Sequence, residues 1–161
     1  MNSIYLALGS NIGNKRQYIL SAIEMLSKKI INIKQASLYE SRAVGFTEQD
    51  HFLNTVISGE TRLSPDALLS FVKDIEIKVG RIERFRWGPR EVDIDILFFN
   101  KIIKYEKHLE IPHPRLHERD FVLVPFVELN PTFIHPHVKK TIKEILERMP
   151  THKRSIINIV T

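Results

Sequence analysis

The sequence contains no cysteine. A disulfide framework, a thiolate metal site and a catalytic cysteine are therefore excluded. No apolar run approaches the roughly 20 residues that a membrane-spanning helix needs. The first residues, MNSIYLALGSN, lack the basic and apolar regions of a signal peptide. We expect a soluble protein that is neither exported nor bound to a membrane and that works in the cytoplasm.

Three common functional motifs are also missing. The chain has no Gly-x-x-x-x-Gly-Lys-Ser/Thr loop and no Gly-x-Gly-x-x-Gly, so neither a P-loop nor a dinucleotide-binding fold is supported. Without cysteine or a His-Glu-x-x-His motif, a zinc site is not favoured. Histidine pairs in proline-rich loops could chelate a metal, but such histidines are more often polar surface residues. The pairs are His113 with His117 and His135 with His137.

The composition is that of one basic globular domain. The 161 residues are 43% hydrophobic, which is enough for a core, and we expect a single domain over residues 1–161. Lysine and arginine total 24 against 19 acidic residues, a formal charge of +5. This balance favours anionic partners, and nucleotide phosphates, nucleic acid and acidic proteins all remain open.

The first half of the chain alternates between strand and helix patterns. Residues 4–8 are apolar and end at a Gly-Ser-Asn turn, which predicts a buried strand. A helix follows, with Asn14 as its cap. Two strands are then predicted at about residues 33–39 and 53–61, joined by the polar loop SRAVGFTEQDH. The apolar stripe of the helix consists of Ile19, Ala22, Ile23, Leu26 and Ile30.

The second helix has clear start and stop signals. Ser64 and Pro65 suit a cap and a first turn, and Gly80 suits the end. A strand over residues 92–99 completes the order β-α-β-β-α-β. This order predicts an α+β, ferredoxin-like fold with an antiparallel sheet, helices on one face and the other face open for a site. A helix over residues 141–149 and a C-terminal strand in SIINIV are expected to follow.

The stretch RWGPREVDIDIL, residues 86–97, carries two acids in the last core strand. Side chains alternate along a strand, so Asp93 and Asp95 project together on one face while Val92, Ile94 and Ile96 project on the other. Two like charges this close repel unless a cation lies between them, and oxygen ligands alone suit Mg²⁺ better than Zn²⁺. The alternative is a solvated strand face whose acids pair with nearby arginines.

Four arginines precede these acids, at positions 81, 84, 86 and 90. Magnesium-binding carboxylates beside several guanidinium groups are the equipment of phosphoryl transfer, in which phosphate oxygens are positioned and neutralised. Internal salt bridges could also account for the cluster. They explain it less well, because the arginines exceed what the local acids need.

RWGPREVDIDIL, together with ALGSN near the N-terminus, FLN at residues 52–54 and IPHPRLHERDFVLVP at residues 111–125, resembles the 6-hydroxymethyl-7,8-dihydropterin pyrophosphokinase family. The motifs occur in the family's order and span nearly the whole chain. The resemblance implies a ferredoxin-like fold and a role in folate biosynthesis. It also implies transfer of the pyrophosphoryl group of ATP to the pterin hydroxymethyl oxygen, with release of AMP. A monomer with small-molecule substrates, and with no nucleic-acid or membrane partner, is expected.

The resemblance also assigns roles to individual residues. Asp93 and Asp95 would hold two Mg²⁺ ions and, with Arg81 and Arg90, would form the catalytic set. Phe52 stands where some members have tyrosine, and the arginine loop is a residue shorter than in some relatives, so Arg84 is left unplaced. ATP would be bound by Lys73, Arg81, Arg90, Ile96, His113 and Arg119, and the pterin by Ser41, Val44, Gly45, Phe52, Asn54 and Phe121.

Two other functions fit parts of the sequence. Ferredoxin-like sheets also bind RNA, and this chain is basic, but it lacks the aromatic strand motif of RNA-binding sheets. A metal-dependent phosphohydrolase would use the same acids with water as the acceptor. Loops 43–50 and 81–89 are candidates for closing over bound substrates and excluding that water.

Overall fold

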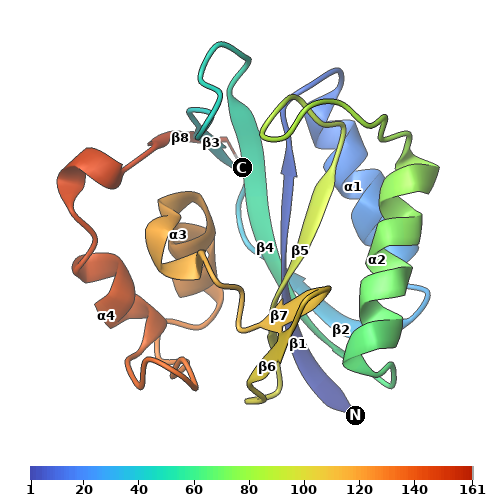
Figure 1. The fold of residues 1–161 in the computed structure, drawn as a ribbon, viewed down its shortest axis with the longest axis vertical. Helices are drawn as coiled ribbons and strands as arrows, with labels where there is room; N and C mark the ends of the chain where they lie inside the picture. Colours follow the sequence, from blue (N-terminus) through green and yellow to red (C-terminus); the bar gives the residue numbers. More distant parts are fainter. Residues whose placement is uncertain (161) are drawn as a thin grey trace.

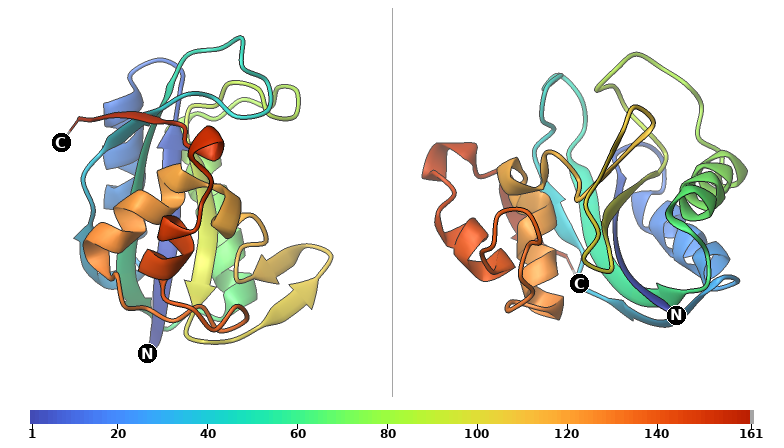
Figure 2. Two further views of the ribbon diagram at one scale, coloured as in Figure 1. Left: turned by 90° about the vertical axis from the view of Figure 1, so that its left-hand side faces the viewer. Right: turned by 60° about the horizontal axis from the view of Figure 1, so that its bottom comes forward.

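The computed structural model describes residues 1–160 and shows a sheet between two helical layers (Figure 1). Helices α1 (Lys15–Leu26) and α2 (Pro65–Val79) cover one face of the sheet. Helices α3 (Asp120–Leu129) and α4 (Ile142–Glu147) pack on the opposite face. The right-hand view of Figure 2 shows the sheet between these layers, and the left-hand view shows α3 and α4 lying over its face. No helix in the described part of the chain is long and apolar enough to cross a membrane.

The sheet has the strand order β5-β1-β4-β3-β8, and β2 also pairs with β4. All of these pairings are antiparallel. The predicted strand at residues 33–39 forms two short strands, β2 and β3, that follow one another along the edge of β4. The predicted β-α-β-β-α-β order is therefore confirmed. The strands are β1 (Asn2–Ser10), β2 (Ile30–Gln35), β3 (Tyr39–Ser41), β4 (Phe52–Thr61), β5 (Asp93–Phe99) and β8 (Ile156–Ile159).

The register of the three central strands aligns residues of interest across the sheet. Gly9 on β1 lies opposite Asn54 on β4 and opposite Asp93 on β5. One step along, Ala7 lies opposite Asp95. Neighbouring strands in a sheet keep their paired residues on the same face, so all five project toward the α3 and α4 side.

The helix signals in the sequence are confirmed in detail. The Asn14 side chain accepts a hydrogen bond from the Gln17 backbone N–H, at 3.2 Å. Ser64 caps α2 in the same way, and Gly80 ends it with a left-handed φ of 118°. One boundary was wrong, because Ile30 does not belong to the first helix. It begins β2 instead, where it is buried against the same core that the helix stripe covers.

Helix α3 was not predicted, and it changes the expectation of an open face. Its residues are apolar on nearly all sides, and Pro125 lies within it, so the segment has no single helical stripe. Val122 and Phe126 of α3 pack with Phe98 of β5 and Ile142 of α4 in a second core. The second face of the sheet is therefore mostly covered.

The remaining elements follow the sheet along the chain. A hairpin of β6 (Lys104–Glu106) and β7 (Leu109–Ile111) leads to a 3-10 turn, η1 (Leu116–Glu118), before α3. The predicted late helix forms as α4 with its Thr141/Glu144 capping box, and the C-terminal strand forms as β8 after a second turn, η2 (Thr151–Lys153).

Asp120 ties this C-terminal segment to the start of α3. Its buried carboxylate accepts hydrogen bonds from the backbone N–H groups of Ser155 and Ile156 at 2.8 and 2.9 Å, and from the Ser155 hydroxyl at 2.5 Å. Asp120→Ala is expected to lower the free energy of unfolding by about 2–4 kcal/mol, because it leaves buried donors without an acceptor. Urea denaturation measures this loss. Ser155→Ala removes one of the three bonds and should cost about 1 kcal/mol; equal losses would contradict the assigned role.

Candidate active site

The two acids of β5 project from the strand as the alternation predicted. Ile94 and Ile96, which flank Asp95, are buried in the core beneath α1 and α2. Asp93 and Asp95 point to the opposite face, with side chains 21% and 28% exposed. The carboxylates are therefore held near each other at a point that the solvent still reaches.

Asp93 is paired with two arginines. Arg81 Nη1 lies 3.0 Å from its Oδ1, and Arg90 Nη1 lies 3.0 Å from its Oδ2. Burial raises the pKa of Asp93, but the charges of Arg90 and Arg81 outweigh it and hold the pKa below its usual value. Arg81 is itself held by the buried Glu76 at 3.1 Å, and Glu76 accepts a 2.7 Å hydrogen bond from the Ile94 N–H. Strand, helix and arginine are thus fixed together at this carboxylate.

The negative charge of Asp95 is balanced much less well by nearby positive charge than that of Asp93. The basic side chains beside Asp95 are Arg119, with Nη1 at 3.6 Å, and the neutral His113, with Nε2 at 3.9 Å, and both lie beyond good hydrogen-bond distance. Burial, followed by the charge of Asp93, raises the pKa of Asp95 to about 7. A carboxylate with this much uncompensated charge, next to a second one, provides the hard oxygen ligands that Mg²⁺ prefers. The donor set therefore fits the predicted metal.

The raised pKa of Asp95 predicts a pH-dependent loss of stability in the metal-free protein. Between pH 3.8 and about pH 7, Asp95 of the folded protein holds a proton that the unfolded chain has released. The contribution of Asp95 to stability therefore falls as the pH rises through this range. Asp95→Asn removes this cost, so the variant should melt about 5 °C above the wild type at pH 8 in EDTA, with a smaller gap at pH 5.

Thermal unfolding followed by circular dichroism measures this difference. Adding Mg²⁺ at pH 8 should raise the melting temperature of the wild type and leave that of the variant unchanged, because binding to the folded state alone stabilises it. If the wild type and Asp95→Asn have identical melting temperatures at pH 8 without metal, the charge of Asp95 does not destabilise the folded protein.

The structure gives Arg84 a role that the sequence left unplaced. Its guanidinium makes two hydrogen bonds to the Glu91 carboxylate, at 2.9 and 2.8 Å. The hydrogen bond from Arg84 lowers the pKa of Glu91 to about 2. Arg84 therefore forms a salt bridge within its own loop, which is what the alternative of internal salt bridges predicts for this residue. Of the four arginines that precede the acids, Arg81 and Arg90 are the two that contact Asp93.

A first cavity collects most of the residues expected to bind the pterin. Its walls come from the central strands, from the loop after β3 and from the start of α3. Asp93, Asp95, Arg90 and Arg119 also line it. The expected pterin residues that line it are Ser41, Val44, Phe52, Asn54 and Phe121. Gly45 lies just outside it, against the side chain of Trp87.

Asn54 and Ser41 form an uncharged polar part of the cavity wall. The Asn54 amide donates a 2.8 Å hydrogen bond to the Ser41 hydroxyl, and both residues are buried. A methyl group on Gly9 would lie 3.1 Å from Asn54 Oδ1, so only glycine leaves this amide its position. Aromatic rings flank the other walls: Arg90 lies over Phe52 at 5.5 Å and Arg119 over Phe121 at 5.7 Å. A flat, polar-edged heterocycle matches this slot.

A second cavity lies on the other side of Asp95. Lys73 of α2, Ile96 of β5 and His113 line it together with the β6–β7 hairpin. Burial, followed by the charge of Arg119, lowers the pKa of His113 to about 4, so the ring is neutral at pH 7. Its Nδ1 accepts the Arg115 N–H at 3.1 Å, which leaves the proton on Nε2, the nitrogen nearer Asp95. His113 can thus donate a hydrogen bond toward the acids.

Several residues at the site were given no role from the sequence. Trp87, Arg115, Glu118 and Arg42 also line the first cavity. Gly9 belongs to the ALGSN motif, and Arg115 and Glu118 to IPHPRLHERDFVLVP, so the motifs contained the signal but no spacing rule assigned the roles. Arg81, expected at the ATP phosphates, lines neither of the two cavities and reaches the site through Asp93.

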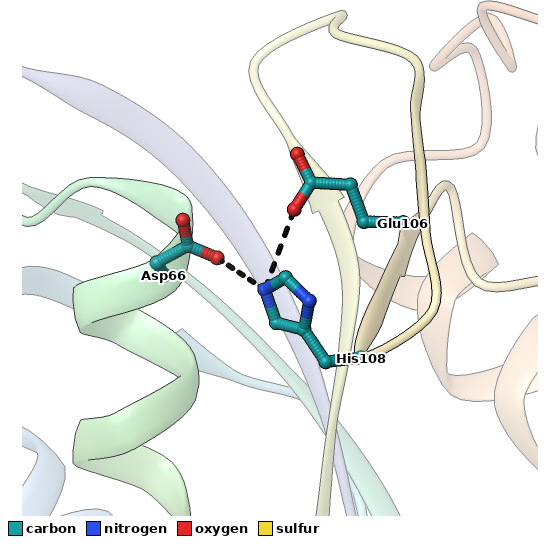
Figure 3. Close-up of side chains that lie close together, drawn as sticks. All are labelled: Asp66, Glu106 and His108. Atoms are coloured by element: carbon teal, nitrogen blue, oxygen red, sulfur yellow. Dashed lines mark hydrogen bonds and ion pairs between the residues drawn. The ribbon is translucent and has the colours of Figure 1, made fainter.

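Figure 3 shows a further cluster of side chains, whose His108 also lines the second cavity. His108 Nε2 lies 2.8 Å from Asp66 Oδ1 and 3.4 Å from Glu106 Oε2, and Lys104 lies 2.6 Å from the same Glu106. Among the described residues this is the group of three potential ligands that come within reach of one ion, and all three are exposed. Each carboxylate already has a basic side chain as its partner, His108 for Asp66 and Lys104 for Glu106. The cluster therefore ties the hairpin, one wall of the second cavity, to the first turn of α2.

Comparison with known proteins identifies the family of the chain. A model of the family "7,8-dihydro-6-hydroxymethylpterin-pyrophosphokinase (HPPK)" matches residues 5–131. The chain is 47% identical over 144 residues to a 2-amino-4-hydroxy-6-hydroxymethyldihydropteridine pyrophosphokinase of Aquifex aeolicus, covering 89% of this chain and 90% of that protein. It is 42% identical over 132 residues to the enzyme of the same name from Bacillus subtilis, covering 80% and 79%.

Longer proteins contain the same domain. The chain is 44% identical to the folic acid synthesis protein FOL1 of Dictyostelium discoideum, covering 92% of this chain but 23% of that protein. A solved Plasmodium falciparum HPPK-DHPS has the same fold, with a TM-score of 0.69 at 19% identity over 92% of this chain and 43% of that one. The chain therefore belongs to the 7,8-dihydro-6-hydroxymethylpterin-pyrophosphokinase family and is an enzyme of folate biosynthesis that transfers a pyrophosphoryl group to hydroxymethyldihydropterin.

Proposed function

We propose that the pyrophosphoryl donor is ATP, that two Mg²⁺ ions assist, and that AMP is the second product. The hydroxymethyl oxygen of 6-hydroxymethyl-7,8-dihydropterin attacks the β-phosphorus, the bond from that phosphorus to the α-phosphate oxygen breaks, and AMP leaves. The hydroxyl proton passes to solvent or to a nearby base. Residues 1–161 act as one catalytic domain.

The position of Asp95 carries this proposal. It is a lining residue of both cavities, the one with aromatic walls and the one beside Lys73 and His113. A group transferred between two substrates must pass between their sites, and the carboxylate at the boundary faces both. The first cavity suits the pterin, and the second suits the nucleotide, with Ile96 against the base.

Each charged residue then has a task in the transfer. Asp93 and Asp95 would hold the metal, which when bound neutralises phosphate oxygens and orients the attacking hydroxyl. Arg90 and Arg81 contact Asp93 in the free protein, and they can turn to phosphate oxygens once the carboxylate has a metal to bind. Arg119 and the Nε2–H of His113 lie beside Asp95. Charge on the moving group is thereby met by donors already in position.

The pterin would be held by shape and by its polar edge. Phe121 and Phe52 supply ring faces, and Asn54, placed by Ser41, supplies an amide that can read donors and acceptors in a plane. Backbone groups near Val44 and Gly45 complete the rim. Phe52 has no hydroxyl, so it contributes packing alone.

A product assay tests the proposal. The purified protein is incubated with Mg-ATP, with and without 6-hydroxymethyl-7,8-dihydropterin, and AMP, ADP and pterin products are separated. Pterin-dependent AMP, matched by pyrophosphorylated pterin, is expected, and EDTA should abolish both. ADP would mean transfer of a single phosphoryl group. ATP breakdown without pterin would mean that water is the acceptor, as in a phosphohydrolase.

We also propose a cytoplasmic monomer whose partners are these small molecules, without nucleic acid or membrane. The acids at the end of β5 would repel a nucleic-acid backbone in the absence of metal, which disfavours the RNA-binding alternative. Nucleic-acid binding that falls steeply with salt and is indifferent to Mg²⁺ would argue for that alternative. Sedimentation equilibrium gives the oligomeric state.

A further inference from the structure

Trp87 lies where three segments of the chain meet. It belongs to the loop over residues 81–90 and has a left-handed φ of 65°. From the loop after β3, Gln49 donates a 2.7 Å hydrogen bond to the Trp87 carbonyl oxygen. In the same loop, a methyl group on Gly45 would lie 3.2 Å from Trp87 Cβ. Phe46 and Phe85 add an edge-to-face contact between the two loops at 5.0 Å.

The third segment contributes Arg115. Its guanidinium carbon lies 4.6 Å from the centroid of the Trp87 ring, closer than the 5.2 Å of Arg86. The Arg115 backbone N–H donates to His113 Nδ1, and Leu116 beside it is fully buried in the second core. Arg115 is therefore attached to the body of the domain, whereas Arg86 belongs to the same loop as Trp87.

The charge of Arg115 is not used in an ion pair. Arg81 and Arg90 face Asp93, and Arg84 faces Glu91. Within residues 1–160, by contrast, no carboxylate lies within 4.0 Å of the Arg115 guanidinium, and its recorded side-chain contact is the indole. A guanidinium over an indole face is attracted by the negative face of the ring. The contact can therefore fix the ring without competing for the acids.

We propose that Arg115 is a positioning residue that holds Trp87 as one wall of the first cavity. Both residues line that cavity, together with Phe121 and Asn54. This inference rests on the proposed binding of the pterin there. With Arg115 in place, the loop presents the indole to the substrate in a defined position. Without it, each binding event must order the ring.

Trp87 is the only tryptophan, so its fluorescence tests the contact directly. In the free protein, Arg115→Gln should shift the emission maximum and raise the acrylamide quenching constant about twofold or more, because a cation is removed from the ring and the ring becomes more accessible. Arg86→Gln is the matched control and should change quenching much less. Equal changes in the two variants, or none in Arg115→Gln, would overturn the proposal. No substrate is needed for this measurement.

Steady-state kinetics test the consequence. Arg115→Gln should raise KM for the pterin about three- to tenfold, with KM for ATP and kcat within about twofold of the wild type. A rise in KM for ATP, or a fall in kcat alone, would mean that Arg115 acts on phosphate instead. An unchanged KM for the pterin, with altered fluorescence, would also reject the positioning role.

A double-mutant cycle separates the two residues. If Arg115 acts through the indole, Arg115→Gln should have no further effect on KM for the pterin in a Trp87→Leu background. Full additivity would contradict the proposal. Should the wild type form no pterin-dependent product, the proposed function fails, while the fluorescence comparison still decides whether the contact exists.

Discussion

Replacing Asp95 with asparagine should reduce kcat by at least about a thousandfold, because the amide keeps the size of the side chain and removes the charge that would hold magnesium between the substrates. AMP formation at saturating Mg-ATP and pterin measures the loss. The fold should persist, since the Asp95 carboxylate makes no hydrogen bond at a good distance to any described residue. The melting temperature checks this directly.

A matched substitution controls for a general effect of charge. Asp74 lies on the exposed side of α2, paired with Lys78 at 2.8 Å, and Asp74→Asn should leave kcat within about twofold of the wild type. If the kcat of Asp95→Asn lies within tenfold of the wild type, the metal role is rejected. Asp95 would then be an ordinary solvated residue on the face of the strand.

Arg90→Ala should lower kcat/KM for ATP about a hundredfold, because the variant loses a donor that we place on a phosphate oxygen as negative charge moves to AMP. Arg81 still contacts Asp93 in this variant, so the carboxylate is not left unpaired and the protein should fold. Arg90→Lys should recover only part of the loss, since an ammonium group cannot reproduce the planar fork. Initial rates at varied Mg-ATP give these values.

Arg84→Ala is the matched control for Arg90→Ala. Both arginines belong to the same loop, but Arg84 is bound to Glu91. Its loss should lower the free energy of unfolding by about 1–3 kcal/mol, because the mostly buried Glu91 carboxylate loses its partner. The value of kcat/KM for ATP should fall less than about fivefold. Equal kinetic losses in the two variants would show that the arginines maintain the loop and do not act on the phosphates.

The sequence predicted the parts of the fold that depend on local rules. The caps at Asn14 and Ser64 and the stop at Gly80 act within one helical turn, so neighbouring residues suffice to reveal them. The two faces of β5 followed from strict alternation at Asp93 and Asp95. The family motifs then led to residues that the structure gathers in the two cavities.

The rest depended on contacts between distant segments. Ile30 fits the helix period as well as a strand, and the choice is made by pairing with β4. Helix α3 is apolar all round because it packs between the sheet and α4, which a single stripe cannot show. Arg84 and Arg115 are chemically identical in the sequence, and the partner that each meets, a carboxylate or an indole, decides their roles.

The alignment of Asn54, Gly9 and Asp93 across three strands fixes a length. Adjacent strands are spaced about 4.8 Å apart, so the Asn54 and Asp93 backbones stand about 10 Å apart. That separation is a property of the hydrogen-bonded ladder and does not depend on the loops above it. Loops in such a protein can therefore change in length and sequence during evolution, while the span between Asn54, which we propose binds the pterin edge, and Asp93, which we propose holds the metal, stays constant.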